Sequence, residues 1–344
     1  MRATEVKFSG KTVQYLFDAD FLVLTEIYAP EKLVIITDEN VYRFQQQRLE
    51  GLKTIVIKAG EENKQQATVD HIILQLLEAE ADRQTVIVGL GGGVVTDIAG
   101  YVASVFKRGV RLVQMPSSVL AMVDAAVGGK NGVDVGAYKN QVGTIYQPEH
   151  LLFDYSLLST LPREEWINGF AEIIKHACIK DAGQFEFLAA HTIDDFMNDR
   201  SLLASFIERN VGIKLNVVLN DEFETGERKL LNYGHTLGHA IEAFYSLPHG
   251  HAISIGMVAA ATLSTELATL PVDEKEKIRT LLSRYELPVS IAFDAEKLWS
   301  ILMNDKKREN DSMSFILLNK IGEGIVQPIP LSRLKQLIQQ RLLA

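Results

Sequence analysis

Short apolar runs alternate with helix-like segments through roughly the first 150 residues of the chain, and this alternation constrains the fold most. The predicted strands are 33–37, 54–57, 85–88 and 111–115. The predicted helices between them are 65–82 and 94–106. Strands that alternate with helices form a parallel sheet, whose ligands bind at the carboxyl ends of the strands. The pattern therefore predicts an N-terminal α/β domain.

The pattern changes after about residue 154, where long segments show helical periodicity. These segments are 163–180, 202–219, 228–245, 252–270 and 273–285. Two short strands, 314–318 and 324–327, are predicted before a last helix. A chain of 344 residues is long enough for two domains. We predict an α/β domain at 1–155 and a mostly α-helical domain at 156–344, with the chemistry in the cleft between them.

Charge and composition exclude several classes of protein. The chain carries 35 Lys and Arg against 44 Asp and Glu, a net charge of -9, which disfavours nucleic acid or an anionic membrane as a partner. The longest apolar run, 252–265, is interrupted by serines and is shorter than the ~20 residues of a membrane span. A single cysteine, Cys178, cannot form an internal disulfide, and the N-terminus does not resemble a signal peptide. We predict a soluble, cytoplasmic protein.

Glycines follow the predicted strand at 85–88, in the segment Gly89–Asp97. Glycines allow a ligand to approach the backbone, and a helix N-terminus offers N–H groups to phosphate, but a tight structural turn explains the segment equally well. Asp38 ends an earlier strand and either accepts from a ribose hydroxyl or starts a turn. The loop 60–64 is either a nucleotide contact or a solvated charged turn. The segment 117–139 combines lysines with small residues and suits phosphate or carboxylate binding.

Four of the eight histidines lie between His235 and His251. His239 follows His235 by four positions, so the two lie on one face of a helix, as metal ligands often do. His249 and His251 come from a loop that opens the next helix.

A carboxylate would complete this metal site. Glu172 is the best candidate because it lies among apolar residues, where an unpaired carboxylate is costly. Glu242 is its rival on spacing. His176, one turn after Glu172, is a further candidate that we interpret as structural.

The motifs together resemble the 3-dehydroquinate synthase family of sugar phosphate cyclases. In chain order they are GGGVVTD, KRG, VDAAVGGKNGVD, KNQVG, AEIIKHA, LNYGHTLGHAIE, PHGHAISIGM and NDKK. The resemblance runs from about Asp38 to Lys307. It implies an NAD-binding α/β domain followed by a helical domain, and a homodimer.

The resemblance also implies the site. It assigns the divalent metal, zinc or another such as cobalt, to Glu172, His235 and His249, and it places His239 on the substrate. The implied NAD contacts are Asp38, Glu61, Lys64, Gly92, Gly93, Val94, Asp97, Ser117, Ser118, Lys139 and Thr160. The implied substrate contacts are Arg108, Asp124, Lys130, Asn140, Lys175, Lys214, Arg228, Asn232, His239 and Lys307. Among these, the predicted catalytic residues are Lys130, Lys175, Lys214, Asn232 and His239. Arg108 matches an arginine that the family lends across the dimer interface, and in NDKK we choose Lys307 over Lys306.

A few positions depart from the family's usual residues. Thr96 replaces a common glycine, and His251 replaces a common glutamate. Ser117-Ser118 replaces Thr-Thr, and Ala125-Ala126 replaces Ser-Ser. None of them removes an implied metal ligand.

The implied activity is conversion of 3-deoxy-D-arabino-heptulosonate 7-phosphate to 3-dehydroquinate and phosphate. NAD oxidises the substrate transiently, phosphate is eliminated, and re-reduction and an aldol closure follow. Three alternatives are another sugar phosphate cyclase, a metal- and NAD-dependent polyol dehydrogenase, and a non-catalytic NAD-binding homologue. Arg228 and Lys307 favour an acidic substrate because they can pair with its carboxylate.

Overall fold

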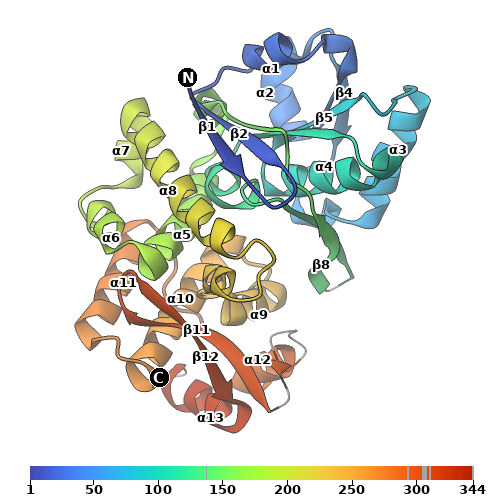
Figure 1. Cartoon of the computed structure of the whole chain (residues 1–344). Helices are drawn as coiled ribbons and strands as arrows, with labels where there is room; N and C mark the ends of the chain where they lie inside the picture. The colour runs from blue at the N-terminus through green and yellow to red at the C-terminus, as the bar shows by residue number, and fades with distance from the viewer. Residues whose placement is uncertain (137, 293, 304–307, 310, 343–344) are drawn as a thin grey trace. The chain divides into compact units, whose positions relative to one another are not determined.

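The computed structural model describes residues 1–136, 138–292, 294–303, 308–309 and 311–342 (Figure 1). The described residues form two compact units, one from 1–165 and 200–223, the other from within 166–199 and 224–344. The sequence predicts one division, after residue 155. The chain instead leaves the first unit after Glu165 and returns to it for residues 200–223, because that segment is a helix that packs in the first unit.

A largely parallel sheet forms the centre of the first unit, with the strand order β1-β2-β9-β6-β5-β3-β4. Its strands are β1 (Arg2–Lys7), β2 (Thr12–Phe17), β3 (Leu33–Asp38), β4 (Lys53–Ile57), β5 (Val86–Gly91), β6 (Arg111–Pro116) and β9 (His150–Phe153). β1 and β2 are antiparallel, and the other neighbours are parallel. The predicted parallel α/β sheet is thus confirmed, and the predicted strands correspond to β3, β4, β5 and β6.

Apolar side chains on both faces of the sheet explain its uninterrupted apolar runs. Leu33 and Ile35 of β3 belong to one buried cluster with Leu24, whereas Val34 and Ile36 belong to a second cluster on the other face. The helices of the unit are α1 (Leu22–Ile27), α2 (Glu39–Leu49), α3 (Gln66–Glu78), α4 (Gly93–Val105) and α8 (Arg200–Asn220). A separate antiparallel hairpin consists of β7 (Lys130–Val135) and β8 (Tyr138–Ile145).

The second unit is mostly helical, as predicted, and carries a small antiparallel sheet. Its helices are α5 (Arg163–Lys180), α6 (Ala182–Ala189), α7 (Ile193–Asn198), α9 (His235–Tyr245), α10 (His249–Leu267), α11 (Val272–Arg284), α12 (Ala295–Leu302) and α13 (Leu331–Leu337). The sheet has the order β10 (Arg308–Glu309), β11 (Ser312–Lys320) and β12 (Glu323–Pro330). One apolar core joins α9, α10 and β11 through Leu237, Ile255 and Phe315. Figure 1 shows β11 and β12 beside α13.

The helix predicted at 228–245 is wrong in one respect, because it is interrupted. A short helical turn, Glu227–Asn232, ends before Tyr233, and α9 begins at His235. Gly234 between them has φ +78°, and a Cβ there would lie 2.7 Å from Met257 Cγ of α10. A left-handed backbone and the absence of space both require glycine, so the chain turns here instead of continuing as a helix.

Among the residues that the structure describes, no helix has both the length and the apolar character needed to cross a membrane.

Candidate functional site

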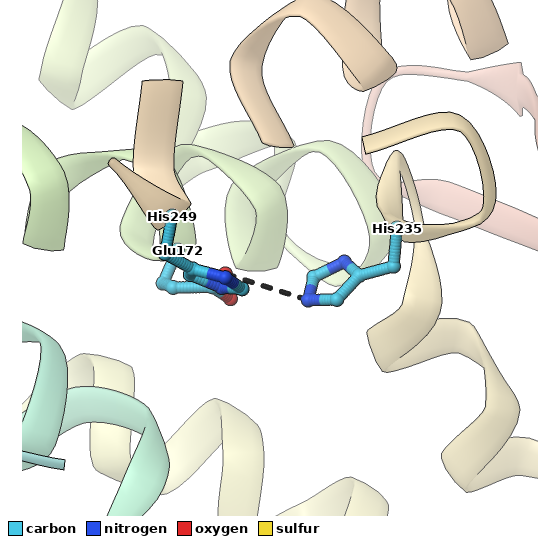
Figure 2. A group of neighbouring side chains, drawn as sticks. All are labelled: Glu172, His235 and His249. Atoms are coloured by element: carbon cyan, nitrogen blue, oxygen red, sulfur yellow. Dashed lines mark hydrogen bonds and ion pairs between the residues drawn. The ribbon is translucent and has the colours of Figure 1, made fainter. Parts of the chain in front are cut away.

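Three side chains converge in the second unit (Figure 2). Glu172 lies within α5, while His235 and His249 are the first residues of α9 and α10. His249 Nε2 lies 3.2 Å from Glu172 Oε1, and His235 Nε2 lies 3.5 Å from the same oxygen. The donor atoms of the three residues all lie within 4.8 Å of one another. Two imidazole nitrogens and one carboxylate oxygen at this spacing have the chemistry of a divalent metal centre.

Glycines at the starts of two helices set the positions of these histidines. Gly234 directs the chain into α9 at His235. Gly250 follows His249, and its backbone N–H donates to Asn168 Oδ1 of α5. A Cβ on Gly250 would lie 2.7 Å from that same oxygen. The start of α10 is therefore held directly against α5, the helix that carries Glu172.

Each histidine has a hydrogen-bond partner behind its ring. His235 Nδ1 lies 3.1 Å from the backbone carbonyl oxygen of Tyr233, and His249 Nδ1 lies 3.3 Å from Glu242 Oε2. Both partners are acceptors, so they favour the tautomer with hydrogen on Nδ1. That tautomer leaves the Nε2 lone pairs directed at the shared position near Glu172. Such support from behind the ring is typical of histidines that bind metals.

Charged groups surround Glu172, which is fully buried. Its Oε1 faces the two histidines, while its Oε2 forms an ion pair with Lys175 Nζ on the next turn of α5. Burial alone would lower the pKa of His249, but hydrogen bonds and charge from Glu172 and Glu242 outweigh it and raise the pKa to about 10. In the absence of a metal, His249 is therefore protonated at neutral pH.

The alternative metal ligands that the sequence offers, His239, Glu242 and His176, lie near this cluster. The potential ligand atoms of His239, Glu242 and His249 also lie within 4.8 Å of one another. The ring centroids of His235 and His239 are 5.1 Å apart. Glu172, however, is the carboxylate that both Nε2 atoms face. His176 is fully buried within α5.

The other predicted substrate contacts of the second unit are Arg228, Asn232 and Lys307, and only the first two belong to the described residues. Arg228 is buried in the helical turn that precedes Gly234. Asn232 Nδ2 donates to Glu224 Oε1 over 2.8 Å. Lys307 and its rival Lys306 lie outside the described residues.

In the first unit, the predicted NAD contacts gather at the carboxyl ends of neighbouring parallel strands. β3 ends at Asp38, β5 leads into Gly92–Val94, and β6 leads into Ser117 and Ser118. Gly92 is the N-cap of α4, so the backbone N–H groups of the first turn point out of this edge. A Cβ on Gly89 would lie 2.8 Å from Ala99 Cβ of α4. The glycine segment thus allows α4 to pack closely on β5. Its glycines also place no side chain of their own in front of the backbone N–H groups at the N-terminus of α4.

Asp38 has a structural role that the sequence offered as one of two alternatives. Its Oδ1 accepts from the backbone N–H groups of Asn40 at 2.9 Å and Val41 at 3.0 Å, so it caps α2. Burial raises the pKa of its carboxyl group, although the same two hydrogen bonds act in the opposite direction.

A buried lysine links two of the predicted groups. Lys64 Nζ lies 2.6 Å from Asp97 Oδ2 and donates to Asn140 Oδ1 over 2.7 Å. Burial would lower the pKa of Lys64, but the charges of Asp97 and Glu61 outweigh it and hold the pKa above its usual value. Asp97, a predicted NAD contact, and Asn140, a predicted substrate contact, therefore share one cation.

The other predicted groups of the first unit are more dispersed. Lys214 Nζ of α8 lies 2.6 Å from Asp124 Oδ1, which brings together two predicted substrate contacts. Lys139 Nζ is 4.0 Å from Glu61 Oε1, within a weak ion pair. Lys130, Arg108 and Thr160 are exposed, and Arg108 has φ +67° directly after Lys107 with φ +50°.

The sequence does not identify two carboxylates that contact site residues. It offers Glu242 only as a possible metal ligand, whereas Glu242 Oε2 lies 3.3 Å from Nδ1 of His249. The seven-residue spacing from His235, which places Glu242 on the same face of α9, is the signal available in the sequence. Glu224 has no such signal, and only its contact with Asn232 identifies it.

Most of the chain matches known proteins. Residues 54–168 match the family described as 3-dehydroquinate synthase N-terminal, and residues 169–308 match 3-dehydroquinate synthase C-terminal. A 3-dehydroquinate synthase from Leptospira interrogans is 40% identical over 301 residues, which cover 85% of this chain and 83% of the relative.

Two solved structures share the fold over nearly their full length. A 2-deoxy-scyllo-inosose synthase complexed with carbaglucose-6-phosphate, NAD+ and Co2+ has a TM-score of 0.85 and 25% identity, with 98% of this chain and 100% of that chain covered. The 2-epi-5-epi-valiolone synthase ValA from Streptomyces hygroscopicus, with NAD+ and Zn2+ bound, has a TM-score of 0.87 and 24% identity, with 99% of both chains covered.

Proposed function

Because this chain belongs to the 3-dehydroquinate synthase family, we propose that it converts 3-deoxy-D-arabino-heptulosonate 7-phosphate to 3-dehydroquinate and phosphate. The observation that carries the proposal is the cluster of Glu172, His235 and His249, with Lys175 on the second oxygen of Glu172. A buried cation beside a metal centre suits an anionic substrate, whereas a simple polyol offers no charge for it to bind.

We propose NAD and a divalent metal, zinc or cobalt, as the cofactors. The nitrogen and oxygen donors fit such a metal, and the glycine edge with the open N-terminus of α4 fits the phosphates of a dinucleotide. When bound, NAD accepts and returns a hydride, and the metal polarises the hydroxyl oxygens of the substrate.

The residues of the second unit then have distinct roles. Glu172, His235 and His249 hold the metal through one oxygen and two Nε2 atoms. Lys175, itself buried, supplies positive charge next to that centre, and Arg228 offers a planar fork to a carboxylate. His239 follows His235 by one helical turn and would donate to a phosphate oxygen.

The first unit contributes the edge of the sheet where β5 ends and α4 begins, at residues 91–94. We call this the nucleotide edge. The unit also contributes further polar groups. The N–H groups at Gly93 and Val94 bind phosphate, and the Lys64–Asp97 pair keeps its charges fixed beside this edge. We assign to the substrate the remaining predicted groups of this unit, which are Asp124, Lys130, Asn140 and Lys214.

We further propose a homodimer in which Arg108 reaches the partner subunit's site. Arg108 is exposed, and two successive residues with positive φ hold its loop in an unusual conformation, which is common at functional positions. Mixing inactive Arg108→Ala protein with an inactive His235→Ala variant would restore activity in mixed dimers, whereas no restoration would contradict this assignment.

Phosphate release from 3-deoxy-D-arabino-heptulosonate 7-phosphate, followed together with absorbance for NADH, tests the proposed reaction. We expect phosphate release with catalytic NAD+ and no net NADH. Net accumulation of NADH would indicate a dehydrogenase. Release only from another sugar phosphate would indicate a different cyclase, and a protein that binds NAD but does not react would be a non-catalytic homologue.

A further inference from the structure

The geometry points to Glu242 as a positioning residue, which holds the metal ligand His249 in its productive tautomer and orientation. The inference rests on the proposed metal centre and adds to it a residue outside the ligand set.

His249 has both ring nitrogens engaged by carboxylates. Its Nε2 lies 3.2 Å from Glu172 Oε1, and its Nδ1 lies 3.3 Å from Glu242 Oε2. A carboxylate is an acceptor, so the Glu242 contact requires hydrogen on Nδ1. A neutral imidazole with hydrogen on Nδ1 has its lone pair on Nε2, the atom that faces Glu172 and His235. Glu242 thereby selects the nitrogen that is available to the metal.

Burial gives this contact its importance. The Glu242 side chain is only 9% exposed. A carboxylate in such a position is costly unless a hydrogen-bond donor satisfies it. His249 supplies such a donor, so the imidazole and the carboxylate restrain each other.

His235 provides an internal contrast. Its Nδ1 faces the backbone carbonyl oxygen of Tyr233 at 3.1 Å, which no side-chain substitution removes. The orientation of His249 depends instead on a side chain that comes from a different helix. Substitution of Glu242 should therefore disturb one ligand and leave the other in place.

Metal affinity measures this role without requiring turnover. We would titrate the metal-free protein with Co2+ against a chelator, record the visible absorption of bound Co2+, and compare wild type with Glu242→Leu, which has no hydrogen-bond acceptor in its side chain. We expect Glu242→Leu to bind Co2+ about 10–100-fold more weakly, with an altered spectrum, as is usual when the hydrogen-bond partner of a metal-binding histidine is lost. Glu266→Leu is the matched control, because it makes the same change at an exposed position about 25 Å along α10 from His249.

Each other outcome overturns the inference in a recognisable way. Wild-type affinity in Glu242→Leu would show that Glu242 does not position His249. Loss as complete as in His235→Ala would make Glu242 a direct ligand, consistent with its proximity to His239. Absence of Co2+ binding by the wild type would defeat the metal centre itself, and the inference with it.

A measurement on the unmodified protein covers the case in which Glu242→Leu fails to fold. Long-range 1H–15N correlation spectra of the zinc-loaded wild type report which nitrogen of each histidine carries hydrogen. We expect His249 to carry it on Nδ1. Hydrogen on Nε2 would overturn the inference.

Discussion

The nucleotide edge of the first unit and the metal cluster of the second are built from different parts of the chain. The edge consists largely of backbone, with the glycines at 91–93 and the first N–H groups of α4 at the ends of parallel strands. The cluster consists of side chains from three helices, of which Glu172 and His235 are buried and His249 is half-buried. A site formed by backbone groups is lost only when the local fold changes, whereas a site formed by side chains can be lost through a single substitution. Substitutions should therefore affect the two regions differently.

The largest expected effect is in the metal cluster. We expect His235→Ala to reduce turnover by at least about 10³-fold, because the metal's contribution of several kcal/mol is lost. Binding of NAD should remain close to wild type, since the nucleotide edge lies in the other unit. Phosphate release and NAD titration measure the two properties, with the exposed His71→Ala as the control. Substantial activity in His235→Ala would contradict the assignment of this ligand.

The Lys64–Asp97 pair is the exception in which the nucleotide edge depends on a single side chain. Lys64→Met leaves Asp97 without its main counter-charge, and we expect a loss of roughly 3 kcal/mol in the free energy of unfolding. This is near the lower end for a broken buried pair, because the Asp97 side chain is 17% exposed. Urea unfolding checks it against Lys32→Met, which removes an exposed, solvent-screened pair with Asp82 and should change the free energy of unfolding much less. Equal losses in the two variants would show that the pair is effectively solvated.

The pH dependence of metal affinity should separate the two regions further. The metal-free protein holds a proton on His249, whose pKa is raised to about 10, and a metal must displace that proton. Raising the pH towards 10 removes the competing proton, so Zn2+ affinity should rise by about tenfold per pH unit above pH 7. NAD affinity should show no such dependence. Chelator competition at several pH values measures the slope, and a flat profile above pH 7.5 would mean that His249 is already neutral.

Packing beneath the nucleotide edge should respond to a single methyl group. In Gly89→Ala the new Cβ would overlap Gln114 Oε1 of β6 and lie 2.8 Å from Ala99 Cβ of α4, so the Gln114 side chain and α4 must both move. We expect a loss of about 1–3 kcal/mol in the free energy of unfolding and weaker NAD binding, with metal affinity unchanged. Gly10→Ala is the control, because a Cβ there meets nothing within 4 Å. A stable variant with normal NAD binding would show that the helix can shift freely.

The smallest effect is expected at Asp38. Asp38→Ala removes the cap of α2 and should cost about 0.5–2 kcal/mol in the free energy of unfolding. Asp38→Asn retains an oxygen that can accept from the same backbone N–H groups, so it should be nearly neutral. Thermal unfolding and NAD titration distinguish capping from direct binding. A stable Asp38→Asn variant with much weaker NAD binding would favour the ribose contact.

The alternation of strands and helices can be predicted from the sequence, because that alternation depends on local apolar periodicity. β3 through β6 and α5 lie where that periodicity placed them, because strands buried on both faces and long helices leave clear patterns. The edge strand β1 and its neighbour β2 are not predicted from the sequence. Most residues of β1 are exposed, so it has no apolar run to reveal it.

The motifs also fixed which residues to examine at the metal site, but tertiary structure decided how they are used. Spacing paired His235 with His239, since it reports only neighbours on one helix. Which carboxylate faces both Nε2 atoms depends on how α5 packs against the starts of α9 and α10. The place of Glu242 behind His249 likewise depends on two helices meeting, and periodicity within either one contains no information about the other.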